Sequence, residues 1–90
     1  MGKVEAFAIE GFEILFYSND HLPPHFHVKK TGEWEIRVEI RETTENMLAF
    51  SVKWPNDFDG PSSNTRKVLR TSVVEHREEL LEEWEEKVNY

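Results

Sequence analysis

Residues 25–40 read HFHVKKTGEWEIRVEI, and the order of apolar and polar side chains in this stretch decides the fold. Apolar residues take alternate positions at 26 and 28 and again from 34 to 40, and Thr31-Gly32 separates the two runs. Side chains of a β-strand point alternately to its two faces, so each run predicts a strand with one buried face and one polar face. The turn between them predicts an antiparallel hairpin.

Three further runs of branched and aromatic residues predict strands on either side of this hairpin, at residues 4–9, 12–17 and 48–54. Residues 42–46 form a polar loop, and residues 55–61 consist largely of the proline, asparagine, aspartate and glycine that are typical of turns.

A helix is predicted from Ser62 or Ser63, either of which can cap it, over most of the remaining chain. Its apolar stripe, at spacings of three and four, consists of Leu69, Val73, His76, Leu80 and Trp84. On this stripe we expect His76 to be a buried, hydrogen-bonded histidine rather than a metal ligand. The sequence leaves open whether the helix breaks near Glu75-His76 into two.

Together these elements predict a single domain over residues 1–90 of the α+β class. It consists of an antiparallel meander of four to five strands with a long C-terminal helix, straight or kinked, packed on one face.

The charges of the predicted helix oppose its dipole. Arg66, Lys67 and Arg70 lie near its start, whereas glutamates crowd its end from Glu75 to Glu86. Packing of the apolar stripe must therefore hold it in place. Its acidic face is either a solvated surface or a docking site for a basic partner.

Composition narrows the function classes. The net charge of -7 is unfavourable for binding the backbone of nucleic acids, and no apolar run approaches the length of a membrane span. The chain has no cysteine, which removes disulfides and thiolate chemistry and fits a cytoplasmic location.

Residues 19–28 read NDHLPPHFHV and hold three of the four histidines of the chain. His25 and His27 share one face of a predicted strand, about 7 Å apart along it, so that both can reach one metal ion. His21 can supply a third ligand from the loop before the Pro23-Pro24 bend. Asp20 is either an oxygen ligand or a partner that orients an imidazole. The only cofactor that this pattern suggests is a divalent metal such as zinc.

Two other interpretations of these histidines stand beside the metal site. They can be structural side chains that hydrogen-bond the carbonyl groups left unpaired by the proline-rich loop, with His27 next to Glu35 or Arg37 on the outer face. They can also form a binding or catalytic site without metal.

The stretch from Phe16 to Val28 resembles the signature of the small bacterial proteins grouped as the domain of unknown function DUF4160, which reads F-x-D-H-x-P-P-H-F-H-V. Residues 75–84 also resemble the closing helix of that family, whereas residues 41–61 look longer and more polar than its usual link. The positions that carry the motif here, and that the resemblance marks as candidate binding residues, are Asp20, His21, Pro23, Pro24, His25 and His27.

The resemblance implies a small cytoplasmic protein, often encoded beside a second small protein of the DUF2442 type, in a toxin–antitoxin-like arrangement. Our first hypothesis is therefore an interaction module that contacts a second small protein, or another copy of itself, through its acidic helix or a sheet edge. The alternative is a histidine-based hydrolase of phosphodiesters, with His21, His25 and His27 as metal ligands or as general acid and base. A third interpretation gives the histidines a structural role and places the function elsewhere.

Overall fold

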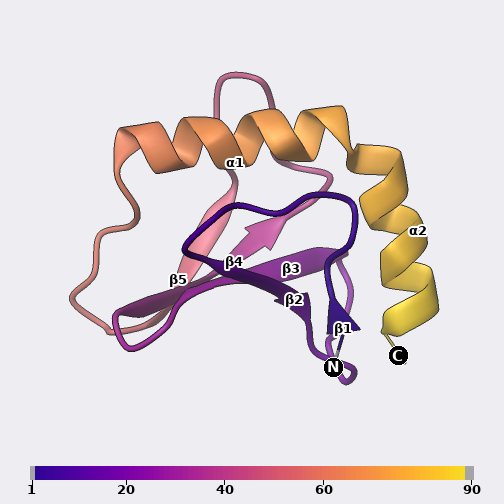
Figure 1. The fold of residues 1–90 in the computed structure, drawn as a ribbon, viewed down its shortest axis with the longest axis horizontal. Coiled ribbons are helices and arrows are strands. Elements are labelled where there is room, and N and C mark those ends of the chain that lie inside the picture. The colour runs from indigo at the N-terminus through magenta and orange to yellow at the C-terminus, as the bar shows by residue number, and fades with distance from the viewer. Residues whose placement is uncertain (1, 89–90) are drawn as a thin grey trace.

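The computed structural model describes residues 2–88, which form one antiparallel sheet and two helices (Figure 1). The five strands follow one another across the sheet in chain order. They are β1 (Gly2–Lys3), β2 (Glu13–Phe16), β3 (His25–Lys30), β4 (Trp34–Glu39) and β5 (Phe50–Trp54). The predicted α+β meander is thereby confirmed.

The β3–β4 hairpin has the register that its alternation predicts. Phe26 lies opposite Val38 and Val28 opposite Ile36, and all four side chains are buried. His27 lies opposite Arg37 on the other face of the sheet.

The prediction of a first strand over residues 4–9 is wrong. Residues 4–9 form no strand, and β1 is limited to two residues that pair with the end of β2. The backbone N–H groups of Glu5 and Ala6 donate instead to the two carboxylate oxygens of Glu83, each at 2.7 Å. A side chain 77 residues away thus replaces the partner strand, and no local pattern indicates this.

Of the alternatives left open for the C-terminal segment, the structure has two helices rather than one long one: α1 (Ser63–Glu75) and α2 (Arg77–Lys87). Ser62 caps α1 by accepting a bond from the Thr65 N–H. The chain breaks at His76, and α2 then runs down beside the sheet while α1 lies across it (Figure 1).

Contacts with two distant parts of the chain fix this break. The His76 ring stacks on Phe7, and the Arg77 guanidinium donates to the backbone carbonyls of Ile40 and Thr43. Because the segment contains neither proline nor glycine, its local sequence does not specify the turn.

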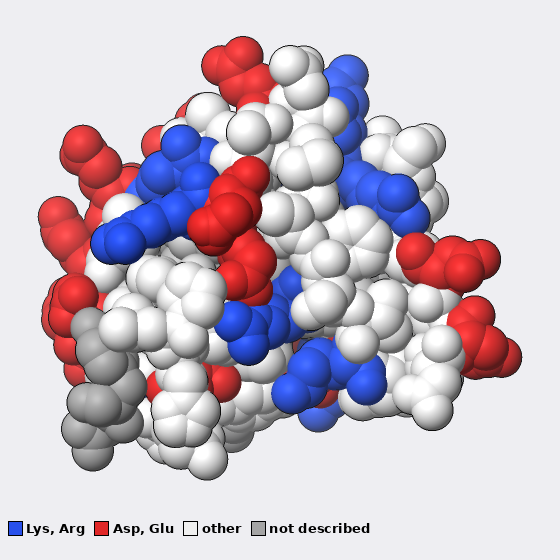
Figure 2. All heavy atoms as spheres, turned by 180° about the vertical axis from the view of Figure 1, so that it is seen from behind, with Lys and Arg blue, Asp and Glu red and all other residues white. Residues whose placement is uncertain are grey.

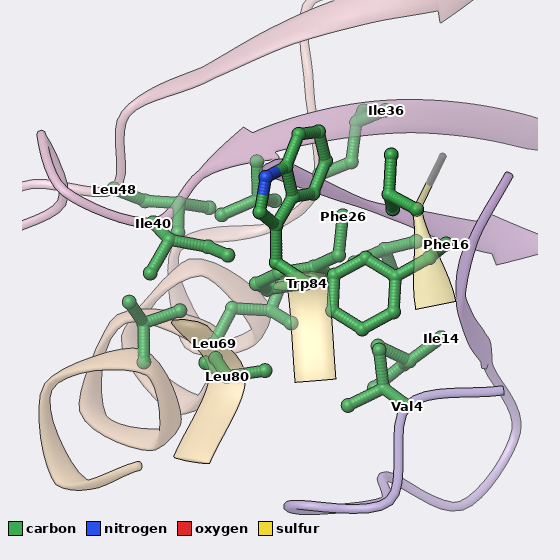
Figure 3. Packing of buried hydrophobic residues seen from close by; sticks show 14 of the residues in the cluster. Val4, Ile14, Phe16, Phe26, Ile36, Ile40, Leu48, Leu69, Leu80 and Trp84 are labelled. Carbon is green, nitrogen blue, oxygen red and sulfur yellow. The ribbon is translucent and has the colours of Figure 1, made fainter. Parts of the chain in front are cut away.

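Trp84 of α2 lies in the centre of the core (Figure 3). Its ring meets Phe16 edge-on at 6.1 Å between centroids, and it is 1% exposed. Leu69 of α1 and Leu80 of α2 complete the layer against the sheet. One core therefore joins all the large elements. Within residues 2–88, neither helix has the length and apolar character needed to cross a membrane.

Candidate functional site

The site begins with the loop that leads into β3. The Asp20 carboxylate accepts a bond from the Tyr17 N–H at 3.0 Å, and the Asp20 N–H donates to the Tyr17 carbonyl at 3.1 Å. These two bonds close a local turn over residues 17–20. The turn aims the carboxylate at the imidazoles of β3.

Pro23 and Pro24 carry the chain from this turn to β3. The Pro24 carbonyl accepts a bond from the Ile40 N–H at 3.1 Å, which anchors the loop to the end of β4. The Pro23 carbonyl lies 2.8 Å from Nδ1 of His25. The two prolines thus shape the site through their carbonyl groups.

His25 is buried, with 2% of its surface exposed. Because a carbonyl oxygen can only accept, the bond to Pro23 places a proton on Nδ1 of His25. Its Nε2 lies 3.3 Å from Oδ1 of Asp20, and its ring lies 5.2 Å from that of Trp84. The expectation that His25 points away from the helices therefore needs correction, because the Trp84 ring of α2 reaches it.

His27 is buried at 1% exposure between two carboxylates. Its Nε2 lies 3.2 Å from each oxygen of Asp20, and its Nδ1 lies 3.4 Å from Oε2 of Glu35 without making a hydrogen bond. Burial lowers the pKa of His27, and the neighbouring Asp20 carboxylate partly opposes that shift.

Glu35 and Tyr17 complete the cluster. The sequence analysis named Glu35 as one of two possible neighbours of His27 and gave Tyr17 no role. Glu35 is 5% exposed and accepts a bond from the Tyr17 hydroxyl at 3.1 Å. Burial is the largest cause and the bond to Glu35 the second of a rise in the pKa of Tyr17 to about 12. The sequence signal was weak: Glu35 lies within a run of alternating charges, where Arg37 is an equally plausible neighbour of His27. Arg37 instead pairs with Glu39, with Nε and Oε2 2.6 Å apart.

The structure gathers some of the predicted site residues and separates others. Asp20, His25 and His27 each offer a ligand atom within 4.8 Å of the others. His21 has an exposed side chain and does not belong to this group.

His76 lies far from the cluster, at the helix break, where its Nδ1 is 3.1 Å from Oε1 of Glu79. Its side chain is 30% exposed, so the expectation of a buried histidine is wrong. The Phe7 ring and Glu79, rather than the core, provide its contacts.

The site therefore combines a carboxylate and two imidazoles, backed by a second carboxylate and a phenol. Such a set can hold protons in a hydrogen-bonded network or bind one cation. Because both histidine rings are buried, a large substrate can reach their nitrogens only if the surrounding chain moves.

Comparison with known proteins gives one match. The family model described as the domain of unknown function DUF4160 matches residues 11–85, which include the whole site. Neither the curated proteins nor the solved structures contain a match to this chain.

Proposed function

The chain belongs to the family described as the domain of unknown function DUF4160, and from this premise, which assigns no activity, we propose that it is an interaction module that binds a second small protein through the edge of its sheet.

The observation that carries the proposal is the edge strand β5. Within residues 2–88, β5 pairs with β4 on one side and with no strand on the other. An exposed strand edge offers unpaired main-chain donors and acceptors to a partner chain.

The register identifies which groups point outward. The Glu39 N–H donates to the carbonyl of Ala49, which lies opposite it, at 2.8 Å. Hydrogen-bonded pairs alternate with non-bonded pairs along antiparallel strands, so Ser51 also turns its polar groups toward β4. Phe50 and Val52 therefore direct their N–H and C=O groups to the open edge.

An open groove beside β5 adds side-chain contacts to this edge. It measures about 700 Å³, and the residues that line it include Pro23 of the histidine motif and Ser51 of β5. Met47 lies on it with 57% of its surface exposed, and the Arg37–Glu39 ion pair also lines it. Apolar and paired polar groups of this kind suit a protein partner.

The charge distribution supports a protein rather than a nucleic acid. On the face seen in Figure 2, lysine and arginine side chains lie in separate groups among uncharged surface, and acidic side chains crowd the margin where α2 lies. A nucleic-acid site usually presents a continuous basic stripe. We propose a cytoplasmic bacterial location and a toxin–antitoxin-like pair, as the family resemblance implies.

Two variants of one residue test the edge. Val52→Pro and Val52→Ala both shorten the same half-buried side chain, but only proline removes the outward N–H. We expect a small protein of the DUF2442 type to bind wild type and Val52→Ala in isothermal titration calorimetry, and Val52→Pro at least tenfold more weakly. The amides of residues 50 and 52 should gain hydrogen-exchange protection in the complex. Equal affinity of the two variants, or no complex with wild type, contradicts the proposal. If the protein instead self-associates as its concentration rises, and only Val52→Pro abolishes this, the edge binds a second copy of the chain.

A metal-dependent hydrolase of phosphodiesters is the second candidate, favoured by the convergence of Asp20, His25 and His27. It predicts turnover of bis(p-nitrophenyl) phosphate with Zn²⁺, Mn²⁺ or Ni²⁺, and loss of turnover in His27→Gln. Absence of turnover with all three ions eliminates it.

A further inference from the structure

The protons of the buried cluster do not match its acceptors. His25 uses its Nδ1 proton on the Pro23 carbonyl, so Nε2 of the neutral ring carries a lone pair. That lone pair lies 3.3 Å from Oδ1 of Asp20, which is also an acceptor when ionised. Two acceptors at this distance repel unless a metal ion lies between them or the His25 ring takes up a second proton.

His27 has the same difficulty in either neutral tautomer. A proton on Nε2 satisfies Asp20 but leaves a bare Nδ1 facing Oε2 of Glu35 at 3.4 Å. A proton on Nδ1 faces Glu35 correctly but leaves a bare Nε2 against both oxygens of Asp20. One buried pair of acceptors remains in each case.

A metal ion removes both conflicts at once. It accepts the lone pairs of the two Nε2 atoms and of Asp20, while both Nδ1 atoms keep their protons for Pro23 and Glu35. Metal-bound histidines commonly donate their other N–H to a carbonyl or a carboxylate, and this chain supplies one of each. Tyr17 secures this outer layer, with its N–H on Asp20 and its hydroxyl on Glu35.

The two distances from Asp20 to the imidazoles fit a small divalent ion, and the three ligand atoms all lie within 4.8 Å of one another. Zinc bonds of about 2.0–2.2 Å in tetrahedral geometry place neighbouring ligand atoms about 3.3–3.6 Å apart. Oδ1 of Asp20 lies 3.3 Å from Nε2 of His25 and 3.2 Å from Nε2 of His27. Calcium and magnesium prefer sites made of oxygen atoms, so two imidazoles select a first-row transition metal.

We propose that Asp20, His25 and His27 bind one divalent transition-metal ion, with zinc as the best fit, and that the ion fastens the loop of residues 17–24 to β3. The ligand set excludes the exposed His21 and the distant His76. The inference requires neither catalysis nor a partner chain.

The test uses the full chain, stripped of metal with a chelator and titrated with Zn²⁺. Calorimetry should give one ion per chain with micromolar or tighter affinity. In imidazole NMR spectra, His25 and His27 should shift in slow exchange while His21 and His76 stay in place. Saturating zinc should raise the Tm by roughly 10 °C, because the ion binds the folded chain alone.

Matched variants separate the proposed ligands from their neighbours. Asp20→Asn and His27→Gln keep side-chain size and should each weaken zinc binding at least 100-fold and abolish the gain in Tm. His21→Ala should retain wild-type binding. If a ligand variant does not fold, the NMR titration of wild type decides alone.

Three outcomes overturn the proposal. They are weak binding without defined stoichiometry, loss of binding in His21→Ala, and a zinc response that leaves the His25 and His27 signals unmoved. The first of these indicates a cluster held by protons alone.

Discussion

At the scale of single residues, Glu83 shows how a side chain can determine backbone structure far from it in sequence. Its carboxylate accepts the N–H groups of Glu5 and Ala6 and lies 2.9 Å from Nζ of Lys87. Within a helix crowded with glutamates, this one therefore has a structural role, and the interpretation of the acidic face as purely solvated does not apply to it.

We expect Glu83→Ala to lower the free energy of unfolding by roughly 2 kcal/mol, because two backbone donors lose a charged acceptor. Urea denaturation followed by circular dichroism measures the loss. Glu82→Ala, at the exposed neighbouring position, is the control and should change stability by less than about 0.5 kcal/mol. Equal effects of the two variants contradict the assigned role of Glu83.

Tyr17 gives a second prediction at this scale. Its pKa of about 12, raised by burial and then by the bond to Glu35, lies above the ordinary value of 10.0. The folded state therefore holds the phenol proton more tightly than the unfolded state does. The stability that this adds is complete below pH 10 and is lost as the pH rises toward about 12.

Ultraviolet titration of the metal-free protein measures this shift. In Tyr90→Phe, Tyr17 is the remaining tyrosine, and we expect one folded-state transition near pH 12. Unfolded in urea, the same variant should titrate near the ordinary value of 10.0. A folded-state midpoint that coincides with the unfolded one excludes the buried bond between Tyr17 and Glu35.

At the scale of elements, the break at His76 changes how the charges of the C-terminal segment act. In one long helix, Glu78 and Glu79 would lie toward the negative end of the dipole. In the structure they lie in the first turn of α2, where acidic side chains are favourable, and Lys87 lies in its last turn. The charges of this segment oppose the dipole of one long helix, but several of them are favourable to the dipole of α2.

This reversal makes Glu78 and Glu86 a matched pair. Both are exposed on α2, the former in the first turn and the latter next to its end. We expect Glu78→Gln to lower the Tm and Glu86→Gln to raise it, each by the equivalent of about 0.3–1 kcal/mol at low salt. Thermal denaturation at low and high salt measures both, and the difference should shrink as salt screens the charges. Shifts of equal sign indicate that the dipole of α2 does not determine the effect.

At the scale of the whole molecule, one core joins the sheet to both helices. Phe16 and Phe26 from the sheet, Leu69 from α1 and Trp84 from α2 belong to the same buried cluster. No large element can therefore unfold without exposing the buried side chains of the others to water.

We expect α2 and the sheet to unfold in one cooperative transition. The fluorescence of buried Trp84 and Trp34 and the helical circular dichroism signal should give the same urea midpoint. Trp84→Phe should lower that midpoint in both signals together. A helical signal that is lost first would mean that α2 is an independent unit.

The sequence by itself determined the elements whose pattern is local. The alternation over residues 25–40 predicted β3 and β4, and the serine before residue 63 predicted the start of α1. The histidine motif identified three members of the site, Asp20, His25 and His27, because the turn that aims Asp20 and the pleat of β3 both depend on neighbouring residues.

Tertiary structure decided everything that depends on distant partners. Glu83 replaced the expected first strand, and Phe7 and Arg77 fixed the helix break. The Glu35 carboxylate, rather than the side chain of the directly paired Arg37, came to lie against the His27 ring. The sequence predicts both His21 and His25 as candidate metal ligands, but only His25 is buried, against Trp84 of the core. The physical reason is the same each time. These contacts stabilise the protein only when segments far apart in the chain pack together, and the apolar periodicity of the sequence does not show which segments do so.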